Sequence, residues 1–387
     1  METKYKTAIV GGGAAGLVAA ARLSEKYGGG VCVLERGERA GRKLSLTGNG
    51  QGNITNSDVS PEHYRSGKKG FPDAVLAAFP YESAREFYRS AGIFLTAEEG
   101  KKYPLSKQAS SVTDALRFRI EKAGGKTAFS FRAVKAERRG GVYIVTAEDG
   151  RRVTAETLIF AFGGAAAKHL GTDGTAFALA EGFGHTITPL YPSLVQLKTE
   201  TEPLRGLKGI RAEARVKAAG RYAAESRGDL LFTDYGVSGS AVFAVSGAVS
   251  AGGVLEAEFL PDFSERETAA MLESRAALGM PLTGGILHNQ LGRMLEKRAG
   301  GEVAALARLI KHFCLKVTGS LGFDAAQVSA GGVNAEEVDE RTMESRISAG
   351  LYIAGEALDV DGDCGGYNLH WAFASASAAA AHIAEER

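Results

Sequence analysis

The opening of the chain, residues 6–35, restricts the possible fold more than any other segment. The apolar run Lys6–Val10 is followed by the glycine-rich turn Gly11–Gly16, a helical pattern up to Tyr27, and a second apolar run that ends at Glu35. A strand, a tight turn, a helix and a second strand in this order predict a βαβ unit. We therefore expect an α/β protein with a Rossmann-like domain.

The turn of this unit has the spacing G-x-G-x-x-G, formed by Gly11, Gly13, Ala14, Ala15 and Gly16. The first glycine allows the tight turn, the second lets a pyrophosphate approach the backbone, and the third lets helix and strand pack closely. Glu35 ends the second strand, where a carboxylate can bind ribose hydroxyls. The unit predicts a dinucleotide site, and a βαβ turn without a ligand is the alternative.

A second glycine-rich segment, residues 41–53, is too rich in glycine for a core element. Its basic side chains can offset phosphate charge, and its asparagines can pair with the edges of a planar ring system. We expect it to lie along the ligand, with a flexible surface loop as the alternative. The predicted contacts are Arg42, Lys43, Thr47, Gly48, Asn49 and Asn53.

The end of the chain repeats the opening pattern. A short strand, Gly350–Ala354, leads through a glycine-rich turn into a helix from about Tyr367 to Glu385. The N–H groups at the start of this helix favour negative charge. Asp359 or Asp361 could bind ligand hydroxyls or could cap a solvated turn. The predicted contacts are Gly355, Glu356, Asp359, Gly366, Tyr367 and Asn368.

The residues between these segments change pattern several times. Residues 57–125 are predicted to be mainly helical, with Ser111 and Asp114 as a capping box. Three β runs follow in residues 131–162, and a mostly β region spans about 190–263. Residues 265–318 then switch to helical periodicity. Because these regions lie between the opening βαβ unit and the closing strand and helix, we expect the cofactor domain to be discontinuous.

Composition excludes several classes of protein. The three cysteines have neither C-x-x-C nor metal-ligand spacing, so no metal and no redox-active dithiol is expected. We expect Cys32 in a core strand and Cys314 in a core helix. The first strand leaves no room for a secretory signal, and no apolar run is long enough to span a membrane. We therefore expect a cytoplasmic protein without a membrane partner.

The net charge of +1 gives no general attraction to nucleic acid, but the basic residues are unevenly distributed. Residues 205–227 carry seven Arg and Lys against two Glu. This basic run is either the outer face of a strand, which we favour, or a footprint for a phosphate backbone.

Taken in order, these motifs resemble the aminoacetone-oxidase-like, BaiN-type family of FAD-binding proteins. The matching motifs run from end to end: Gly11–Gly16, Gly41–Lys43, Thr47–Gly50, Ala161–Gly164, Leu231–Gly239, Ala330–Val333, Thr342–Ser345, Gly350–Glu356 and Gly366–Leu369. The resemblance implies non-covalent FAD, a β-barrel-like substrate domain with a helical insertion, and reductase or oxidase chemistry. Other proteins that resemble this family include ribosomal RNA dihydrouridine synthase and proteins named for bile-acid or aminoacetone chemistry.

From this resemblance we predict the bounds of three regions and the remaining residues that contact FAD. The FAD-binding domain comprises residues 1–190 and 326–387, the β-rich substrate domain 191–264 and 319–325, and the helical insertion 265–318. Further predicted FAD contacts are Arg36, Val134, Ala161 and Gly163. The turn before the last helix would lie beneath the flavin pyrimidine ring, where helix N–H groups stabilise negative charge.

Flavin carries the redox chemistry, so the motifs require no unique acid or base. Candidate catalytic residues are Cys364, Tyr367, His370 and Tyr235, and for Cys364 and His370 a structural role is favoured. The sequence contains one full G-x-G-x-x-G motif, so a second complete domain for a nicotinamide is not indicated. NAD(P)H would therefore dock transiently over the flavin.

Three functions are compatible with these residues. The first is a reductase of an unsaturated ring or enone, with uridine in 23S ribosomal RNA as one candidate substrate. The alternatives are an oxidase of a small amine such as aminoacetone and a non-catalytic flavin-binding module.

Overall fold

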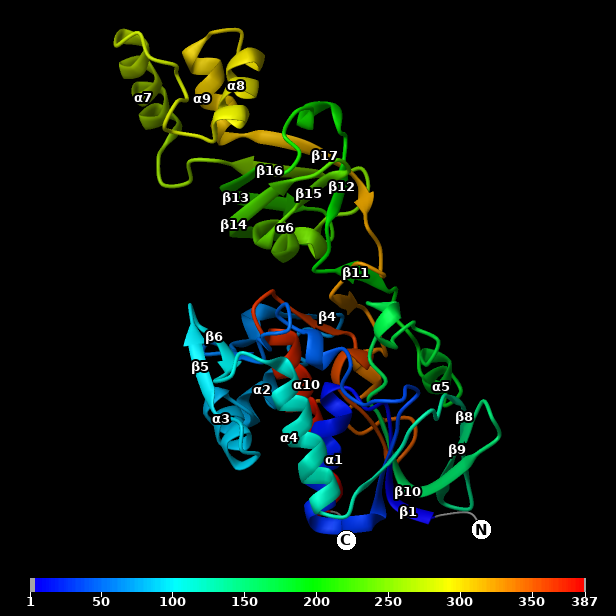
Figure 1. Ribbon diagram of the computed structural model, residues 1–387. Coiled ribbons are helices and arrows are strands. Elements are labelled where there is room, and N and C mark those ends of the chain that lie inside the picture. The colour runs from blue at the N-terminus through cyan, green and yellow to red at the C-terminus, as the bar shows by residue number, and fades with distance from the viewer. Residues whose placement is uncertain (1–3, 386–387) are drawn as a thin grey trace. The chain divides into compact units, whose positions relative to one another are not determined.

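The structure, a computed structural model, describes residues 4–385, and the chain divides into two compact units. Unit 1 comprises Met1–Tyr191 and Val328–Arg387, and unit 2 comprises Pro192–Gln327 (Figure 1). The chain leaves unit 1 within β11 (Tyr191–Ser193) and re-enters it at β18 (Val328–Ala330). Among residues 4–385, no helix has both the length and the apolar character needed to cross a bilayer.

Unit 1 is built on a seven-stranded sheet with parallel strands at its centre. In spatial order the strands are β7 (Lys126–Ala128), β2 (Val31–Leu34), β1 (Lys4–Val10), β10 (Arg152–Phe160), β9 (Val142–Ala147) and β8 (Ala133–Arg139), and β19 (Leu351–Ile353) also pairs with β10. The predicted opening βαβ unit and the three-stranded meander of residues 131–162 are both confirmed. β1, β10 and β19 are parallel, so their carboxyl ends lie at one edge of the sheet.

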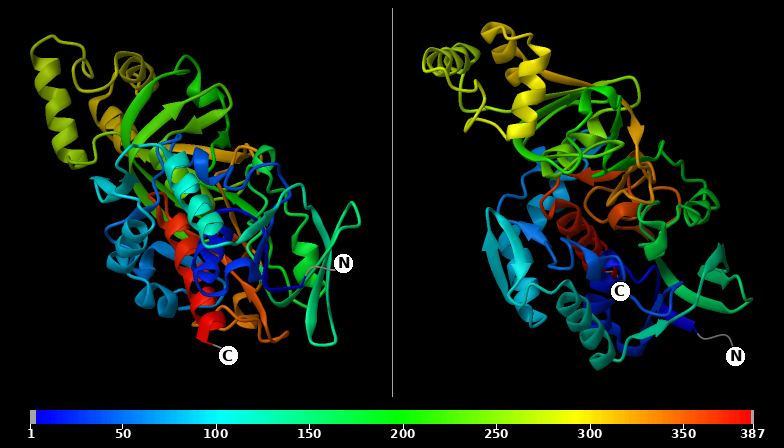
Figure 2. Two further views of the ribbon diagram at one scale, coloured as in Figure 1. Left: turned by 60° about the horizontal axis from the view of Figure 1, so that its bottom comes forward. Right: turned by 45° about the horizontal axis from the view of Figure 1, so that its top comes forward.

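Two long helices of unit 1 pack against α1 (Ala14–Tyr27), which is buried along most of its length. It contacts α10 (Tyr367–Glu385) and α4 (Ala109–Lys122), and Figures 1 and 2 show these helices side by side. Alanines along α1 and α10 allow close approach, because small side chains leave little bulk between two helices. The remaining helices are α2 (Asp73–Ala78), α3 (Tyr81–Ser90) and α5 (Phe177–Glu181).

Short strands hold the residue 50–105 region against the end of the chain. β3 (Thr55–Asn56), β6 (Lys101–Pro104) and β5 (Leu95–Glu98) form one small sheet. β4 (Tyr64–Ser66) pairs antiparallel with β20 (Val360–Gly362), with Arg65 opposite Asp361. The prediction that residues 57–125 are mainly helical is therefore wrong for β4, β5 and β6.

Two local predictions in this region and in unit 2 are also wrong. Helix α4 begins at Ala109, so Ser111 lies inside its first turn and its hydroxyl donates to the carbonyl of Gln108 instead of capping the helix. Cys314 lies on β17 and is exposed, because the alternating pattern of this strand buries Phe313, Leu315 and Val317 and turns Cys314 outward.

Unit 2 is a closed six-stranded barrel whose interior is apolar. Its strands, in order around the barrel, are β12 (Leu197–Thr199), β15 (Gly236–Ser238), β14 (Ala223–Phe232), β13 (Arg211–Ala219), β16 (Val254–Glu258) and β17 (Phe313–Ser320). Helix α6 (Ser240–Val245) packs against β14. The barrel predicted from the resemblance is confirmed.

Three helices lie between β16 and β17: α7 (Glu265–Ala277), α8 (Asn289–Arg298) and α9 (Val303–Lys311). The helical insertion is present, but its predicted end at residue 318 is wrong. β17 already begins at Phe313, where helical periodicity gives way to alternation.

Candidate functional site

The β1–α1 turn requires glycine at both ends of its motif. Gly11 has φ +104°, and a Cβ there would lie 2.4 Å from the carbonyl oxygen of Ala161 at the end of β10. A Cβ on Gly16 would lie 1.9 Å from the carbonyl oxygen of Gly11. Both contacts are with backbone that cannot move aside, so these two glycines are needed by the fold itself.

Gly13 differs, because the space in front of it is open. A Cβ built on Gly13 would meet no atom of the described chain within 4 Å. Gly13 precedes the first residue of α1, no side chain of residues 4–385 caps this end, and the first turn of α1 contains no acidic residue. An uncapped, uncharged helix start beside open space fits a pyrophosphate, which needs backbone N–H donors and close approach.

Glu35 lies directly after β2 and is fixed by backbone N–H groups. Its Oε2 accepts a hydrogen bond from the Gly12 nitrogen at 2.8 Å, and its Oε1 accepts one from the Gly37 nitrogen at 2.6 Å. Each carboxylate oxygen has a second lone pair. The carboxylate is therefore positioned beside the turn and can still accept a hydrogen bond from a ribose hydroxyl.

The structure brings the three glycine-rich segments of the sequence together. The Gly41 nitrogen donates to the carbonyl of Gly12 at 2.7 Å, which joins segment 41–53 to the α1 turn. The Lys43 ammonium lies 2.8 Å from the Glu356 carboxylate, which joins the same segment to the turn before α10. A Cβ on Gly355 would lie 2.9 Å from the Cβ of Ala15, so the α1 turn and the last turn touch directly. The three segments form one site at the carboxyl edge of the sheet.

The turn before α10 is closed by amide side chains. The Asn368 amide accepts from the Gly362 nitrogen and donates to the Gly362 carbonyl, both at 2.8 Å, and also donates to the Asp363 carbonyl. In the orientation that satisfies both of its amide atoms, Asn53 accepts from the Gly366 nitrogen at 3.2 Å. The amides of two predicted ligand contacts thus bind the turn itself.

The other predicted cofactor contacts lie around this site with protein partners of their own. The Arg36 guanidinium pairs with Asp173 at 2.9 Å, and Arg42 donates to the His169 carbonyl at 3.2 Å. Thr47 donates to the Leu44 carbonyl, and Val134 is exposed on β8. Backbone with positive φ occurs at Gly48, Asn49 and Gly163. Their contacts with a cofactor stay predictions.

Two buried carboxylates, one on β20 and one directly before it, precede the turn that leads into α10. Asp359 accepts a hydrogen bond from the Gly67 nitrogen at 3.2 Å, and burial raises its pKa. Asp361 is 3% exposed, and its Oδ2 has no hydrogen-bond partner within residues 4–385. Burial raises the pKa of Asp361 to about 7, although the Arg65 guanidinium, 3.8 Å away, opposes this shift.

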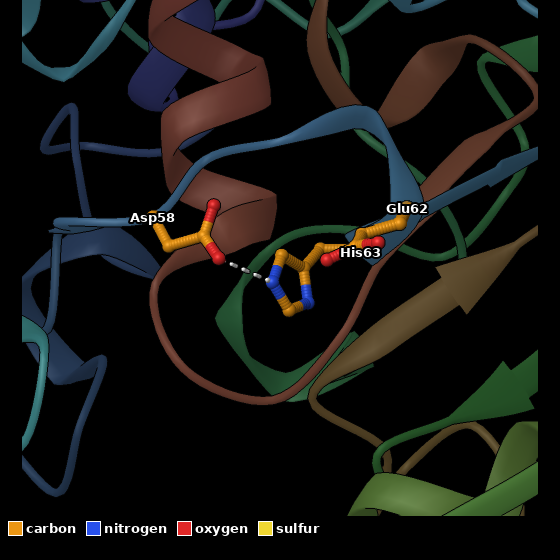
Figure 3. Close-up of side chains that lie close together, drawn as sticks. All are labelled: Asp58, Glu62 and His63. Atoms are coloured by element: carbon orange, nitrogen blue, oxygen red, sulfur yellow. Dashed lines mark hydrogen bonds and ion pairs between the residues drawn. The ribbon is translucent and has the colours of Figure 1, made fainter.

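A histidine that the sequence did not single out lies against this turn. The His63 Nδ1 lies 3.0 Å from a carboxylate oxygen of Asp363, and its Nε2 lies 3.4 Å from Asp58. The His63 ring stacks on Tyr367, with centroids 4.3 Å apart. Figure 3 shows Asp58 and Glu62 on the loop that carries this ring. Both ring nitrogens are engaged by carboxylates, so the group forms a charge network.

The protonation of His63 follows from these neighbours. Burial lowers its pKa, but the hydrogen bonds to Asp363 and Asp58 and their charges outweigh burial, and the net pKa is raised. Tyr367 is buried, and burial together with the nearby carboxylates raises its pKa to about 12. The network therefore favours the protonated form of His63 beside a phenol that is neutral near neutral pH.

The remaining catalytic candidates separate by environment. His370 is fully buried, its Nδ1 pairs with the Thr55 hydroxyl at 2.8 Å, and its Nε2 lies 3.0 Å from the Phe79 carbonyl. Burial lowers the pKa of His370 to about 4, so it is a neutral packing residue. Cys364 is exposed in the turn, and Tyr235 lies in unit 2 between β14 and β15.

Sequence reasoning missed His63 and Ser329. The Ser329 hydroxyl accepts from the nitrogens of Ala165 and Ala166 at 2.7 and 2.8 Å, and the Ser329 nitrogen donates to Glu356. These contacts hold the segment after β10 against the last turn. The sequence carries no signal for either residue. His63 directly precedes β4 and Ser329 lies on β18, and both are strands of three residues whose pairing with distant segments no local pattern predicts.

Comparison with known proteins gives the family. The HI0933-like protein Rossmann domain matches residues 5–382. The chain is 36% identical to the 3-dehydro-bile acid delta(4,6)-reductase of Clostridium scindens, over 97% of this chain and 98% of that protein. It is 30% identical to the ribosomal RNA dihydrouridine synthase of Haemophilus influenzae, over 98% of each chain. The dihydrouridine synthase of Escherichia coli is also 30% identical over 97% of each chain.

A solved structure agrees on the fold. The 3-ketosteroid-delta4-(5alpha)-dehydrogenase of Rhodococcus jostii matches 99% of this chain and 97% of its own, with a TM-score of 0.53 and 14% identity. At that identity the likeness shows the fold alone. The resemblance drawn from the motifs is confirmed by the family match and by the full-length relatives. The chain belongs to the HI0933-like Rossmann-domain family and is a flavin-dependent oxidoreductase.

Proposed function

We propose that unit 1 binds FAD non-covalently and that the protein reduces a carbon–carbon double bond conjugated to a carbonyl in a ring, with NAD(P)H as reductant. The observation that carries the proposal is the meeting of the three glycine-rich segments beside the open space at Gly13. When bound, the flavin supplies two-electron redox chemistry. The protein residues bind, orient and supply protons.

The residues of the site have separate roles in this proposal. The N–H groups at the start of α1 would hold the pyrophosphate, and Glu35 would accept from the ribose hydroxyls. The backbone before Tyr367 would face the pyrimidine ring, where the N-terminus of α10 favours negative charge. Lys43 and Glu356 would fix the distance between these two ends of the cofactor.

The substrate class is supported by the names of the relatives. A delta(4,6)-reductase acts on carbon–carbon double bonds, and a dihydrouridine synthase saturates the double bond of a uracil ring. Both names describe addition of two hydrogens to an unsaturated ring. This common chemistry favours a reductase over an oxidase of a small amine.

A small-molecule acceptor is further supported by the basic run of residues 205–227. Arg211, Arg215, Lys217 and Arg227 on β13 and β14, and Lys208 before them, each form an ion pair with a carboxylate of unit 2. A phosphate backbone would have to displace these partners. Uridine in ribosomal RNA remains a second candidate substrate, favoured by the two relatives of that name.

An anaerobic stopped-flow experiment tests the proposal. The FAD-loaded protein is mixed with NADH or NADPH, and bleaching of the visible flavin band is followed. 2-Cyclohexenone or a uridine-containing RNA fragment is then added. We expect bleaching by a nicotinamide and recovery of the band with an acceptor. No bleaching by either nicotinamide, together with peroxide release from aminoacetone in air, would contradict the proposal and favour an amine oxidase.

A further inference from the structure

The reduction of a carbon–carbon double bond needs a proton in addition to the hydride from the reduced cofactor. The saturated product gains two electrons and two protons. The reduced cofactor supplies both electrons and one proton, so the second proton must come from a protein group or from water. This inference rests on the proposed function, because an amine oxidase would not need such a donor.

Tyr367 satisfies the requirements for a donor at this site. It is the first residue of α10 and follows the glycine pair of the turn that we place at the flavin ring. Its ring is held between His63 on one side and the edge of Tyr64. With a pKa of about 12, its phenol stays protonated at neutral pH and can protonate a stronger base such as an enolate.

Loss of that proton leaves a phenolate, which needs a positive neighbour. The His63 ring stacks on the Tyr367 ring at an interplanar angle of 23°, and a cation over an aromatic face is attracted to it. A cation there also stabilises negative charge that develops on the phenol oxygen.

The surroundings of His63 favour its cationic form. Its Nδ1 lies 3.0 Å from a carboxylate oxygen of Asp363 on the turn, and its Nε2 lies 3.4 Å from one of Asp58 on the loop, so a proton on either nitrogen faces a carboxylate. The Asp363 nitrogen also donates to the His63 carbonyl at 2.9 Å, so backbone and side chain of His63 are both tied to the turn. The other charged or titratable groups around this network are Glu62, Tyr64, Arg65, Asp361 and Cys364.

The network also reaches from solvent to the interior. The Asp58 side chain is 62% exposed, that of His63 is 24% exposed and that of Asp361 is 4% exposed. Arg65 pairs with both Asp363 and Asp361, which keeps the inner carboxylates close to a positive charge. The carboxylates of the network therefore range from solvent-exposed Asp58 to buried Asp361.

We propose that Tyr367 is the proton donor for reduction of the double bond, and that His63, clamped between Asp58 and Asp363, is the positioning residue that stabilises the phenolate. The O–H bond of Tyr367 breaks as the new C–H bond of the product forms, and solvent returns the proton. No further oxidant or reductant takes part in this step.

The test uses the FAD-loaded protein in four forms: wild type, Tyr367→Phe, His63→Gln and His312→Gln. His312 is the matched control, because it also lies near two carboxylates, Glu256 and Glu265, but belongs to unit 2. Each form is reduced with dithionite, and re-oxidation by 2-cyclohexenone is followed without oxygen over a range of pH. Reduction with dithionite removes any dependence on nicotinamide.

We expect Tyr367→Phe to slow re-oxidation by roughly 100-fold or more, the usual effect of removing a general acid. His63→Gln should slow it roughly 3- to 30-fold, the effect of a cation–π interaction on a rate. In the wild type the rate should fall as pH rises through the raised pKa of His63, and His63→Gln should lose this fall. His312→Gln should match the wild type.

A second readout does not depend on activity. In NMR spectra of histidine-labelled protein, the resonance that is missing from His63→Gln identifies His63. In the wild type, the pKa from the titration of this resonance should lie above the ordinary value of 6.5. Asp363→Asn should lower that midpoint, whereas Tyr367→Phe should keep it above 6.5. A His63 midpoint at or below 6.5, or a His63→Gln variant with unchanged rate and pH profile, would overturn the inference. If the wild type is bleached but no enone re-oxidises it, the proposed function itself fails.

Discussion

The two glycine-rich turns of unit 1 begin neighbouring helices but differ in charge. The turn before α1 has an uncapped helix start, no acidic residue in its first turn, and open space at Gly13. The turn before α10 carries Asp359, Asp361 and Asp363, and His63 lies against it. Both turns offer backbone N–H groups, but the second also offers groups that titrate.

This difference separates binding from chemistry. A turn without charged side chains can bind an anionic pyrophosphate at any physiological pH, because nothing in it changes protonation. A turn with buried carboxylates and a histidine changes charge with pH and can exchange protons. We therefore assign affinity for the cofactor to the first turn and proton transfer to the second.

The largest expected effect comes from filling the open space of the first turn. Gly13→Val should leave the apoprotein folded, because Gly13 has φ −81° and no neighbour within 4 Å. It should weaken FAD binding by roughly 100-fold or more, since two charge-assisted hydrogen bonds to the pyrophosphate are lost. Flavin fluorescence titration gives the affinity. Gly29→Val, at the other end of α1, is the control, and full FAD occupancy in Gly13→Val would refute the assignment.

The second turn should make the stability of the folded protein depend on pH. Asp361 has a pKa raised from 3.8 to about 7, so the folded state holds its proton more tightly than the unfolded state. The stability of the wild type should therefore fall as pH rises from about 4 to 7, by roughly 4 kcal/mol from this group. Asp361→Asn should remove this fall, as measured by urea unfolding of the apoprotein through the fluorescence of Trp371, the only tryptophan.

Asp58→Asn is the control of opposite sign. Hydrogen bonds from the Ser60 backbone and side chain, and from His63, lower the pKa of Asp58, so its contribution is present above 3.8 and is lost as pH falls through its folded pKa. Equal pH profiles for Asp361→Asn and wild type would show that Asp361 does not titrate in this range.

A smaller effect is expected from the ion pair that joins the two ends of the site. Glu356→Gln keeps an acceptor for the Ser329 nitrogen but loses the charge paired with Lys43. FAD affinity should fall roughly tenfold, the value of one charge-assisted hydrogen bond. Glu156→Gln breaks a surface pair with Lys6 as the matched control. Equal affinities in the two variants would show that the Lys43–Glu356 pair does not fix the site.

The smallest effect concerns thiol reactivity and needs no mutation. Cys364 lies exposed in the second turn, and Cys314 lies exposed on the barrel of unit 2. FAD should slow alkylation of Cys364 by iodoacetamide and leave Cys314 unchanged. Peptide mass spectrometry separates the two sites. Equal rates at Cys364 with and without FAD would mean that the cofactor does not cover this turn.

The sequence predicts the first turn better than the second. The glycine spacing at residues 11–16 follows from local geometry. Gly11 and Gly16 lie against backbone that leaves no room for a Cβ, and Gly13 borders open space. The chemistry of the second turn depends on β4, a strand of three residues whose pairing with β20 joins Arg65 to Asp361. No local pattern encodes such a pairing, so His63 was not predicted. Cys314 was misplaced for a different reason, because the helical pattern was extended past Phe313, where the alternation of β17 begins.

A crystal structure of the FAD-loaded protein is the most direct test of the division between the two turns. We predict the pyrophosphate within hydrogen-bond distance of the backbone nitrogens at the start of α1, and the pyrimidine ring against the backbone before Tyr367. A pyrophosphate bound away from Gly13, or a flavin ring remote from the turn before α10, would contradict the assignment of binding to one turn and chemistry to the other.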